Sequence, residues 1–426
     1  MIPPTPIMGG DAIYPIATNA LMARKYGLSW MVATDHGGPN HSKVNLEMAY
    51  PELVAARKTV PEVIQFYGME FDTPGADHSS IIVPHTHDEA AKLHEIESGF
   101  AAREAWPPDS LRNTEPKMLE ALSHMRDMER PPVVIAHHPS RSATGIGVYG
   151  LDAPAELRAW NNTAPKVAVG MEGSPGHQAM VFRAGGDTIA PGSRGGYGRQ
   201  PTMGGYDQMT ARLGGFWDSM LGEGRRWWVT ANSDSHVNWR EGGADFWPGE
   251  YSKTYVFAEK EHDDILDGVR SGRIFVTTGD LISELWVAAA SGGAEAAIGG
   301  ELAVESGADV TITVRIKDPV GPNSHGDDPT VRRVDVIVGE VNGHLDDPTV
   351  DTNPTTRVLA RFSSAEWSRS GDYIVVTTTI PALAHNMYVR IRGTNTTELE
   401  PLDDGRDEDP WTDLWFYSNP IFLKVR

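Results

Sequence analysis

The stretch that decides the fold reads Trp227-Trp228-Val229-Thr230-Ala231-Asn232-Ser233-Asp234-Ser235-His236. Its apolar first half predicts a short buried strand, and Asp234 and His236 follow where that strand ends. Because side chains of an extended chain alternate with a period of two, these two polar side chains point to the same side of the backbone. Imidazole and carboxylate are both metal ligands, so the pair suits a metal site at a strand end.

Other apolar runs also end at residues whose side chains can bind a metal. Residues 30–36 end at His36, residues 63–70 at Glu70, and residues 133–138 at His137-His138. A short apolar stretch opened by His78 lies between the last two runs. Strands that each deliver a His, Glu or Asp at the carboxyl end describe a TIM-like barrel with a metal cluster at its top face.

Composition narrows the classes of partner. The 426 residues suffice for two to three domains at roughly 150 residues each. With 37 Lys and Arg against 58 Asp and Glu, the net charge is −21, which argues against nucleic-acid binding and against anionic membrane surfaces. An anionic small molecule stays compatible, because bound divalent cations reverse the local field. The chain has no cysteine, so any metal must be held by histidines and carboxylates.

The pattern of apolar and polar residues changes near residue 280. Before it, apolar runs alternate with helical patterns, which predicts βαβ units and a parallel sheet. After it, alternating strands separated by turn residues at 310–314, 334–338, 373–376 and 387–391 predict an antiparallel β-sandwich. We therefore expect an α/β barrel over residues 1–280 and a β-sandwich over residues 281–426. Most ligand-type residues precede this boundary, so the sandwich is interpreted as scaffold.

Further candidates lie around the expected cluster. Glu172 and His177 follow another apolar run and are candidates for substrate contact. Residues 185–205 are Gly-rich and predict a lid or substrate loop, with a solvated insertion as an equal alternative. Arg199 in this loop and Arg141 after His138 could each hold an anionic oxygen in a bidentate contact, although both fit equally well as surface arginines.

Nothing in the sequence predicts a membrane span, since no apolar run reaches about 18 residues. The start, Met1-Ile2-Pro3-Pro4-Thr5-Pro6, lacks the basic region and apolar core of a signal peptide. As the sequence stands we expect a cytoplasmic protein; an upstream leader would make it a secreted one.

Several motifs together resemble the PHP (polymerase and histidinol phosphatase) superfamily of metal-dependent phosphoesterases, in order as well as in content. They are Thr34-Asp35-His36, Gly68-Met69-Glu70, His78, His138-Pro139 and Asp234-x-His236. The stretch from Gly68 to His78 and the closing Ser271-Gly272-Arg273-Ile274-Phe275 look like the carbaryl-hydrolase-type (CehA/McbA) branch of metallohydrolases. The resemblance covers roughly the whole chain.

The resemblance implies a distorted (β/α)7 barrel with two or three divalent metal ions. Zn, Mn and Fe all suit histidine and carboxylate ligands. Glu70 would bridge two ions, and Asp35 would orient His36 from behind. His137 competes with His138 for a ligand position, and the motif match favours His138. The implied metal ligands are His36, Glu70, His78, His138, Asp234 and His236.

One feature of the family is missing. The family opens with a His-x-His pair on the first barrel strand, whereas Met1–Gly10 contain no histidine. We expect that the true start lies upstream of Met1; a naturally incomplete metal centre is the alternative.

The implied activity is hydrolysis by metal-activated water. A phosphate ester is the expected small-molecule substrate, and His236, Asp234 and His177 are the expected catalytic residues, with His236 or His177 protonating the leaving group. A carboxyl ester, carbamate or amide hydrolase is the first alternative. The second is a degenerate barrel that binds a ligand or partner without catalysis.

Overall fold

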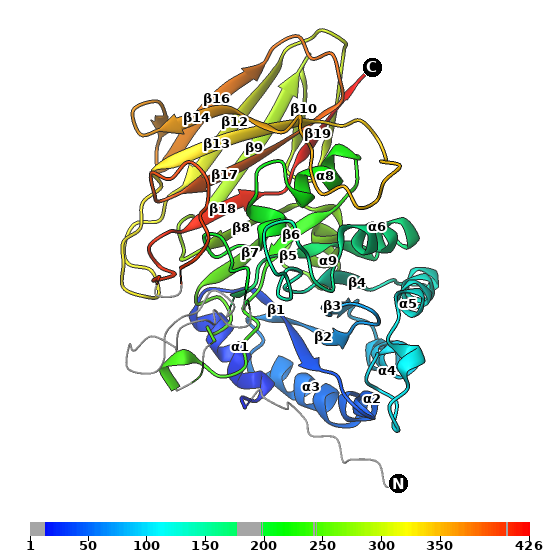
Figure 1. The fold of residues 1–426 in the computed structure, drawn as a ribbon. Coiled ribbons are helices and arrows are strands. Elements are labelled where there is room, and N and C mark those ends of the chain that lie inside the picture. Colours follow the sequence, from blue (N-terminus) through cyan, green and yellow to red (C-terminus); the bar gives the residue numbers. More distant parts are fainter. Residues whose placement is uncertain (1–12, 177–196, 198, 242, 244, 406–407) are drawn as a thin grey trace.

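The computed structural model describes residues 13–176, 197, 199–241, 243, 245–405 and 408–426. An α/β region carries the N-terminal part of the chain, and antiparallel sheets pack on it at the C-terminal side (Figure 1). The helical elements are α1 (Ile16–Lys25), α2 (His41–Val44), the π-helical η1 (Asn45–Ala49), α3 (Tyr50–Thr59), α4 (Glu89–Phe100), η2 (Ser110–Arg112), α5 (Glu115–Asp127), α6 (Pro154–Thr163), α7 (Gln208–Ala211), α8 (Phe216–Gly222), η4 (Trp239–Glu241) and α9 (His262–Ser271).

The first sheet is a six-stranded half-barrel in the order β1-β2-β3-β4-β5-β6. Its strands are β1 (Trp30–His36), β2 (Ile64–Asp72), β3 (His78–Val83), β4 (Val133–Ala136), β5 (Ala168–Ser174) and β6 (Trp228–Ala231). The parallel register of β1 on β2 pairs His36 with Glu70, so two sequence-distant strand ends deliver their polar side chains side by side. Strand β6 ends where the sequence predicts it, just before Asp234.

The expectation of an all-parallel sheet is wrong at β3. This strand runs antiparallel to both β2 and β4. The physical reason is the connection: residues 73–77 join β2 to β3, which is too short for the crossover that parallel neighbours need. Because β3 runs the other way, its ligand-type residue must stand at its beginning to reach the same edge, and His78 does so.

The outer edge of β6 is closed by side chains. Asn419 accepts from the Val229 N–H at 2.9 Å and donates to the Val229 carbonyl at 3.3 Å. Thr254 Oγ1 lies 2.8 Å from both the N–H and the carbonyl oxygen of Ala231. These contacts satisfy backbone groups that a further strand would otherwise pair.

Two further sheets follow. The remaining strands are β7 (Ser252–Val256), β8 (Ile274–Thr278), β9 (Glu284–Ser291), β10 (Ala294–Ala297), β11 (Glu301–Val304), β12 (Val310–Lys317), β13 (Arg333–Glu340), β14 (Arg357–Ser363), β15 (Ser368–Ser370), β16 (Tyr373–Ile380), β17 (Met387–Thr394), β18 (Trp415–Ser418) and β19 (Ile421–Val425). One sheet has the order β10-β9-β12-β16-β15, and the other β11-β19-β17-β18-β8-β7 with β13 and β14 attached. The strands of both sheets pair antiparallel, except that β11 runs parallel to β19. The four strands expected after residue 280 are present as β12, β13, β16 and β17.

Hydrogen bonding crosses the expected boundary at residue 280. Strand β8 pairs with β18, placing Val276 opposite Tyr417. The β7–β8 hairpin therefore belongs to a sheet made mostly by the C-terminal part of the chain. The division at residue 280 stays a prediction.

A buried ion pair ties the α/β region to the second of these sheets. Asp218 on α8 accepts from Arg390 Nε at 2.8 Å and Nη2 at 2.7 Å, and from the Tyr388 hydroxyl at 2.9 Å. All three residues have no exposed surface. A buried charge is tolerated only when it is paired and hydrogen-bonded, so this contact fixes how α8 sits on β17.

Within the described residues, no helix combines the length and the apolar character needed to cross a membrane.

Replacing Asp218 by Ala should destabilise the protein by about 3–5 kcal/mol, because Arg390 is left buried without its partner. Denaturant unfolding of the two proteins measures the difference. The matched control is Arg24→Ala, which breaks the exposed Arg24–Glu62 pair and should leave stability nearly unchanged. Equal effects of the two substitutions would contradict the structural role given to Asp218.

Candidate metal centre

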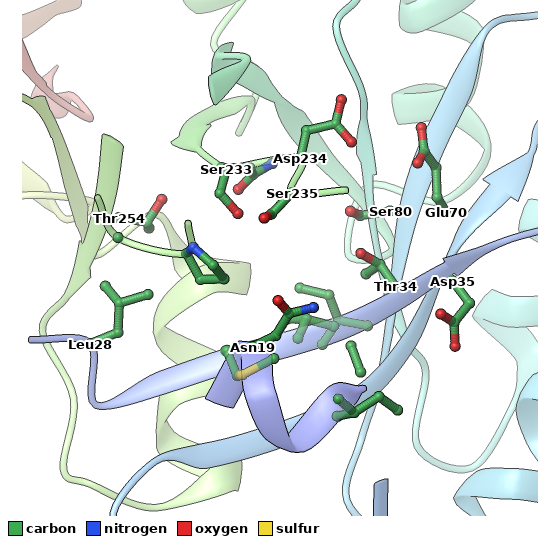
Figure 2. Close-up of a pocket in the computed structure, with 18 of the residues that line it drawn as sticks. Asn19, Leu28, Thr34, Asp35, Glu70, Ser80, Ser233, Asp234, Ser235 and Thr254 are labelled. Atoms are coloured by element: carbon green, nitrogen blue, oxygen red, sulfur yellow. The ribbon is translucent and has the colours of Figure 1, made fainter. Parts of the chain in front are cut away.

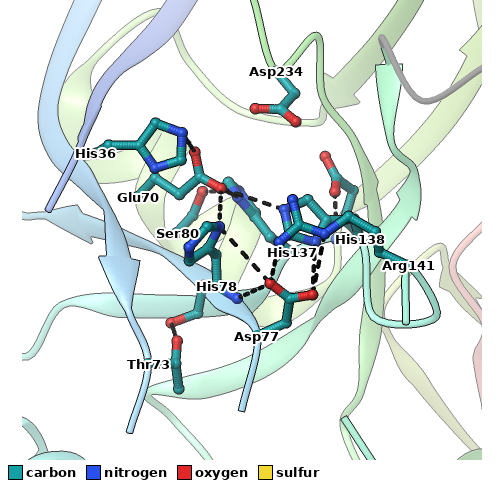
Figure 3. A network of polar contacts seen from close by, with 12 residues as sticks. His36, Glu70, Thr73, Asp77, His78, Ser80, His137, His138, Arg141 and Asp234 are labelled. Atoms are coloured by element: carbon teal, nitrogen blue, oxygen red, sulfur yellow. Dashed lines mark hydrogen bonds and ion pairs between the residues drawn. The ribbon is translucent and has the colours of Figure 1, made fainter. Parts of the chain in front are cut away.

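The first ligand group joins β1, β2 and the segment after β6. His36 Nε2 lies 3.3 Å from Glu70 Oε2 and 3.3 Å from His236 Nε2. His36 and Glu70 lie close together in Figure 3, and His236 completes the group. Their ligand atoms all lie within 4.8 Å of one another, as the ligands of a single ion must.

The second group lies on the other oxygen of the same carboxylate. Glu70 Oε1 is 2.8 Å from His78 Nδ1 and 3.3 Å from His138 Nε2. These atoms also fall within 4.8 Å of one another. Since a carboxylate offers two oxygens, Glu70 can serve one ion on each side. The family resemblance implies this bridging role for Glu70, which stays a prediction.

The backbone at the site is held in an uncommon conformation. His138 has φ 28° and Asp234 has φ 48°, values that disfavour residues other than glycine. The His138 N–H donates to Glu172 Oε2 at 2.6 Å, which helps to hold that conformation. Such strain costs on the order of 1–3 kcal/mol per residue and concentrates at functional sites.

Electrostatics keep the ligands in their metal-binding forms. Burial raises the pKa of Glu70, but the histidine rings beside its oxygens, His137 foremost, outweigh burial and hold the pKa well below its usual value. Burial lowers the pKa of His138, which favours the neutral ring that binds a metal. Burial raises the pKa of the fully buried Glu172 to about 7.

Several buried atoms lack a hydrogen bond, which is the mark of a missing binding partner. Within the described part of the chain, Nδ1 of His78 is buried with no such bond, although Glu70 Oε1 is only 2.8 Å away. The two atoms thus face each other as two ligands of one ion do. The donor set of histidines with one shared carboxylate fits Zn, Mn or Fe.

Carboxylates that sequence reasoning did not assign stand behind the histidines. Asp72 lies 3.7 Å from His78 Nε2, and Asp77 lies 3.7 Å from His138 Nδ1. Both distances exceed that of a hydrogen bond, and each carboxylate is bound by an arginine, Asp72 by Arg103 and Asp77 by Arg141. The two carboxylates therefore add negative charge beside the histidines. The signal for Asp72 was present in the sequence, because Glu70 and Asp72 are two residues apart on one strand and face the same side.

His137 also reaches Glu70, with Nδ1 3.4 Å from Oε1, and its Nε2 pairs with the Ser80 hydroxyl. Burial lowers its pKa, but Glu172 and Glu70 outweigh burial and raise it to about 9. His137 is therefore a neighbour of the shared carboxylate, outside both ligand groups.

Two predicted residues have contacts that differ from the expected ones. Arg141 forms a two-point contact with Asp77, at 2.5 and 3.2 Å, so its guanidinium is engaged inside the protein. Glu172 is fully buried and holds the backbone of His138 instead of facing substrate.

Asp35 gains no contact that would orient His36. Alternation along β1 puts Asp35 and His36 on opposite faces, and His36 Nδ1 is buried without a hydrogen bond among the described residues. Asp234 lines the cavity beside the cluster but belongs to neither ligand group. Arg199 is exposed. His177 lies outside the described residues.

A cavity of about 390 Å³ opens beside the cluster (Figure 2). Its lining includes Trp30, Val32 and Thr34 of β1. It also includes His36, Glu70 and His236 of the first ligand group. Among the described lining residues, four are Asp or Glu and one is Lys, besides the histidines. The lining residue Lys253 is already paired with Asp280.

Comparison of the sequence with models of known protein families and with curated proteins finds no match.

If Glu70 is shared by two metal ions, its loss should remove more metal than the loss of any one histidine. We expect about two equivalents of Zn²⁺ or Mn²⁺ per chain in the unchanged protein, and a loss of both in Glu70→Ala, because Glu70 belongs to both groups. His36→Ala and His138→Ala should each lose one. Elemental analysis after dialysis gives the stoichiometry.

His385→Ala, which changes an exposed histidine far along the chain, is the control and should keep both equivalents. Loss of a single equivalent in Glu70→Ala would contradict a shared ligand.

Proposed function

We propose that this protein is a PHP-type metal-dependent hydrolase that acts on phosphate esters, with a distorted (β/α)7 barrel and a C-terminal β-sandwich. One observation carries the proposal: a buried carboxylate stands between two histidine pairs, contributed by the ends of different strands of one half-barrel. The order of the motifs along the sequence supports the same assignment. A small molecule is the expected substrate, since the cavity holds about 390 Å³.

The site would hold two metal ions, with Glu70 as a ligand of both. His36, Glu70 and His236 would hold one ion, and Glu70, His78 and His138 the other. Bound divalent ions supply a nucleophile by lowering the pKa of water, and stabilise charge on the substrate oxygens. Glu70 would keep the two halves of the site together, and Asp72 and Asp77 add negative charge beside His78 and His138.

Asp234 and His236 stay the proposed catalytic residues on the cavity side. Asp234 lines the cavity, and its left-handed backbone turns the chain so that His236 meets His36. The place of Asp234 beside the cavity supports a contact with bound substrate. His236 would act through the ion, because its Nε2 is then a ligand atom and cannot also protonate a leaving group.

A second candidate is a carboxyl ester, carbamate or amide hydrolase. It is favoured by the state of two cationic side chains that could neutralise a phosphate. Lys253 in the cavity wall and Arg141 near His138 are each engaged by an aspartate. A substrate without a dianionic group would not need them.

Glu70→Gln tests the hydrolase proposal. The substitution keeps the shape of the side chain but removes its charge, so kcat/KM with added Mn²⁺ should fall by more than about 100-fold, the upper range for residues that only support ligands. His385→Ala should retain full activity. Equal activity of Glu70→Gln and the unchanged protein would contradict the proposal.

A direct comparison of p-nitrophenyl phosphate with p-nitrophenyl acetate separates the candidates. The phosphoesterase proposal predicts at least about a tenfold higher kcat/KM for the phosphate, a difference of about 1.4 kcal/mol in transition-state binding. The reverse preference supports the ester hydrolase. Turnover of neither substrate by protein loaded with metal supports a barrel that binds without catalysis.

A further inference from the structure

Asp245 lies directly behind His236, although nine residues separate the two along the chain. Its Oδ2 accepts from the His236 N–H at 2.5 Å and the Val237 N–H at 2.9 Å, and lies 3.2 Å from His236 Nδ1. The residue is 6 % exposed. We propose that Asp245 is the positioning residue of His236: it fixes the ring and keeps the proton on Nδ1, so that Nε2 is the ligand atom. The inference rests on the proposed function.

The contacts of His236 Nδ1 decide the tautomer. The backbone carbonyl oxygen of Asp234 is 3.0 Å away, and Asp245 Oδ2 is 3.2 Å away. Both atoms can only accept, so Nδ1 must be the protonated nitrogen of a neutral ring. Nε2 then carries the lone pair, and it is the atom that lies 3.3 Å from His36 Nε2. Histidines that bind metals donate their other N–H in the same way.

The surrounding loop holds Asp245 in this place. The Asp245 N–H donates to the Val237 carbonyl at 3.1 Å, and the Asp245 carbonyl accepts from Trp239 at 2.9 Å. The Asn238 side chain donates to the Asp245 carbonyl at 3.3 Å and to Glu250 at 3.0 Å. With its backbone fixed on both sides, the carboxylate has little freedom to leave His236. Asp245 therefore acts as a rigid support, as precise ligand placement requires.

The test combines zinc binding with a tautomer measurement. In the metal-free protein, ¹⁵N chemical shifts of the histidine rings report which nitrogen is protonated, and the His236 signal is the one lost in His236→Gln. We expect the Nδ1–H form in the unchanged protein and a smaller Nδ1–H fraction in Asp245→Ala, in which the Asp234 carbonyl is the acceptor that remains. Zinc affinity should fall about 10–100-fold at one of two sites in Asp245→Ala, and less in Asp245→Asn, which keeps an acceptor oxygen.

Glu241→Gln is the matched control, because Glu241 stands in the same loop and is exposed; it should change neither readout. An Nε2–H tautomer in the unchanged protein overturns the inference without any variant being made. Full zinc affinity in folded Asp245→Ala also overturns it, provided that His236→Ala loses zinc. Full affinity in His236→Ala would instead overturn the metal centre itself.

Discussion

The buried carboxylate of Glu70 is the group on which the whole site depends. It is 3 % exposed, and four histidine rings approach its oxygens to within 3.4 Å. A lone ionised carboxylate in such a place would be strongly unfavourable. The histidines that compensate its charge come from β1, β3 and the segment after β4. The order of the strands in the sheet therefore determines which side chains meet at the site. Divalent ions would complete this compensation.

The C-terminal part of the chain supports this arrangement from behind. Asn419, in the turn between β18 and β19, holds the backbone of Val229 on β6. The Asp218–Arg390 pair holds α8 against β17. The strand that leads to Asp234 and His236 is therefore placed by residues nearly two hundred positions away. The interpretation of the C-terminal sheets as scaffold agrees with these contacts.

The pattern of apolar and polar residues along the sequence was enough to predict many of the strands. Apolar runs that end in a polar ligand predicted β1, β2, β4 and β6, and the alternation after residue 280 predicted β12, β13, β16 and β17. The pairing of His36 with Glu70 was predictable because parallel strands end at one edge. The residues that meet there, His36, Glu70, His78, His138 and His236, were all among those expected.

Other features depend on tertiary geometry that no local pattern encodes. The reversed direction of β3 follows from a short turn, and its consequence for His78 is visible only once the sheet is built. Asp245 reaches His236 through the path of a loop, and the engagement of Arg141 by Asp77 depends on how two strand ends face each other. The orienting role expected of Asp35 overlooked the alternation that turns it away from His36.

The most direct measurement is a crystal structure of the protein grown with Mn²⁺, with an anomalous difference map calculated near the manganese edge. The account predicts two peaks flanking Glu70, one beside His36 and His236 and one beside His78 and His138. A map with no peak within bonding distance of Glu70, or with metal bound only elsewhere, would contradict it.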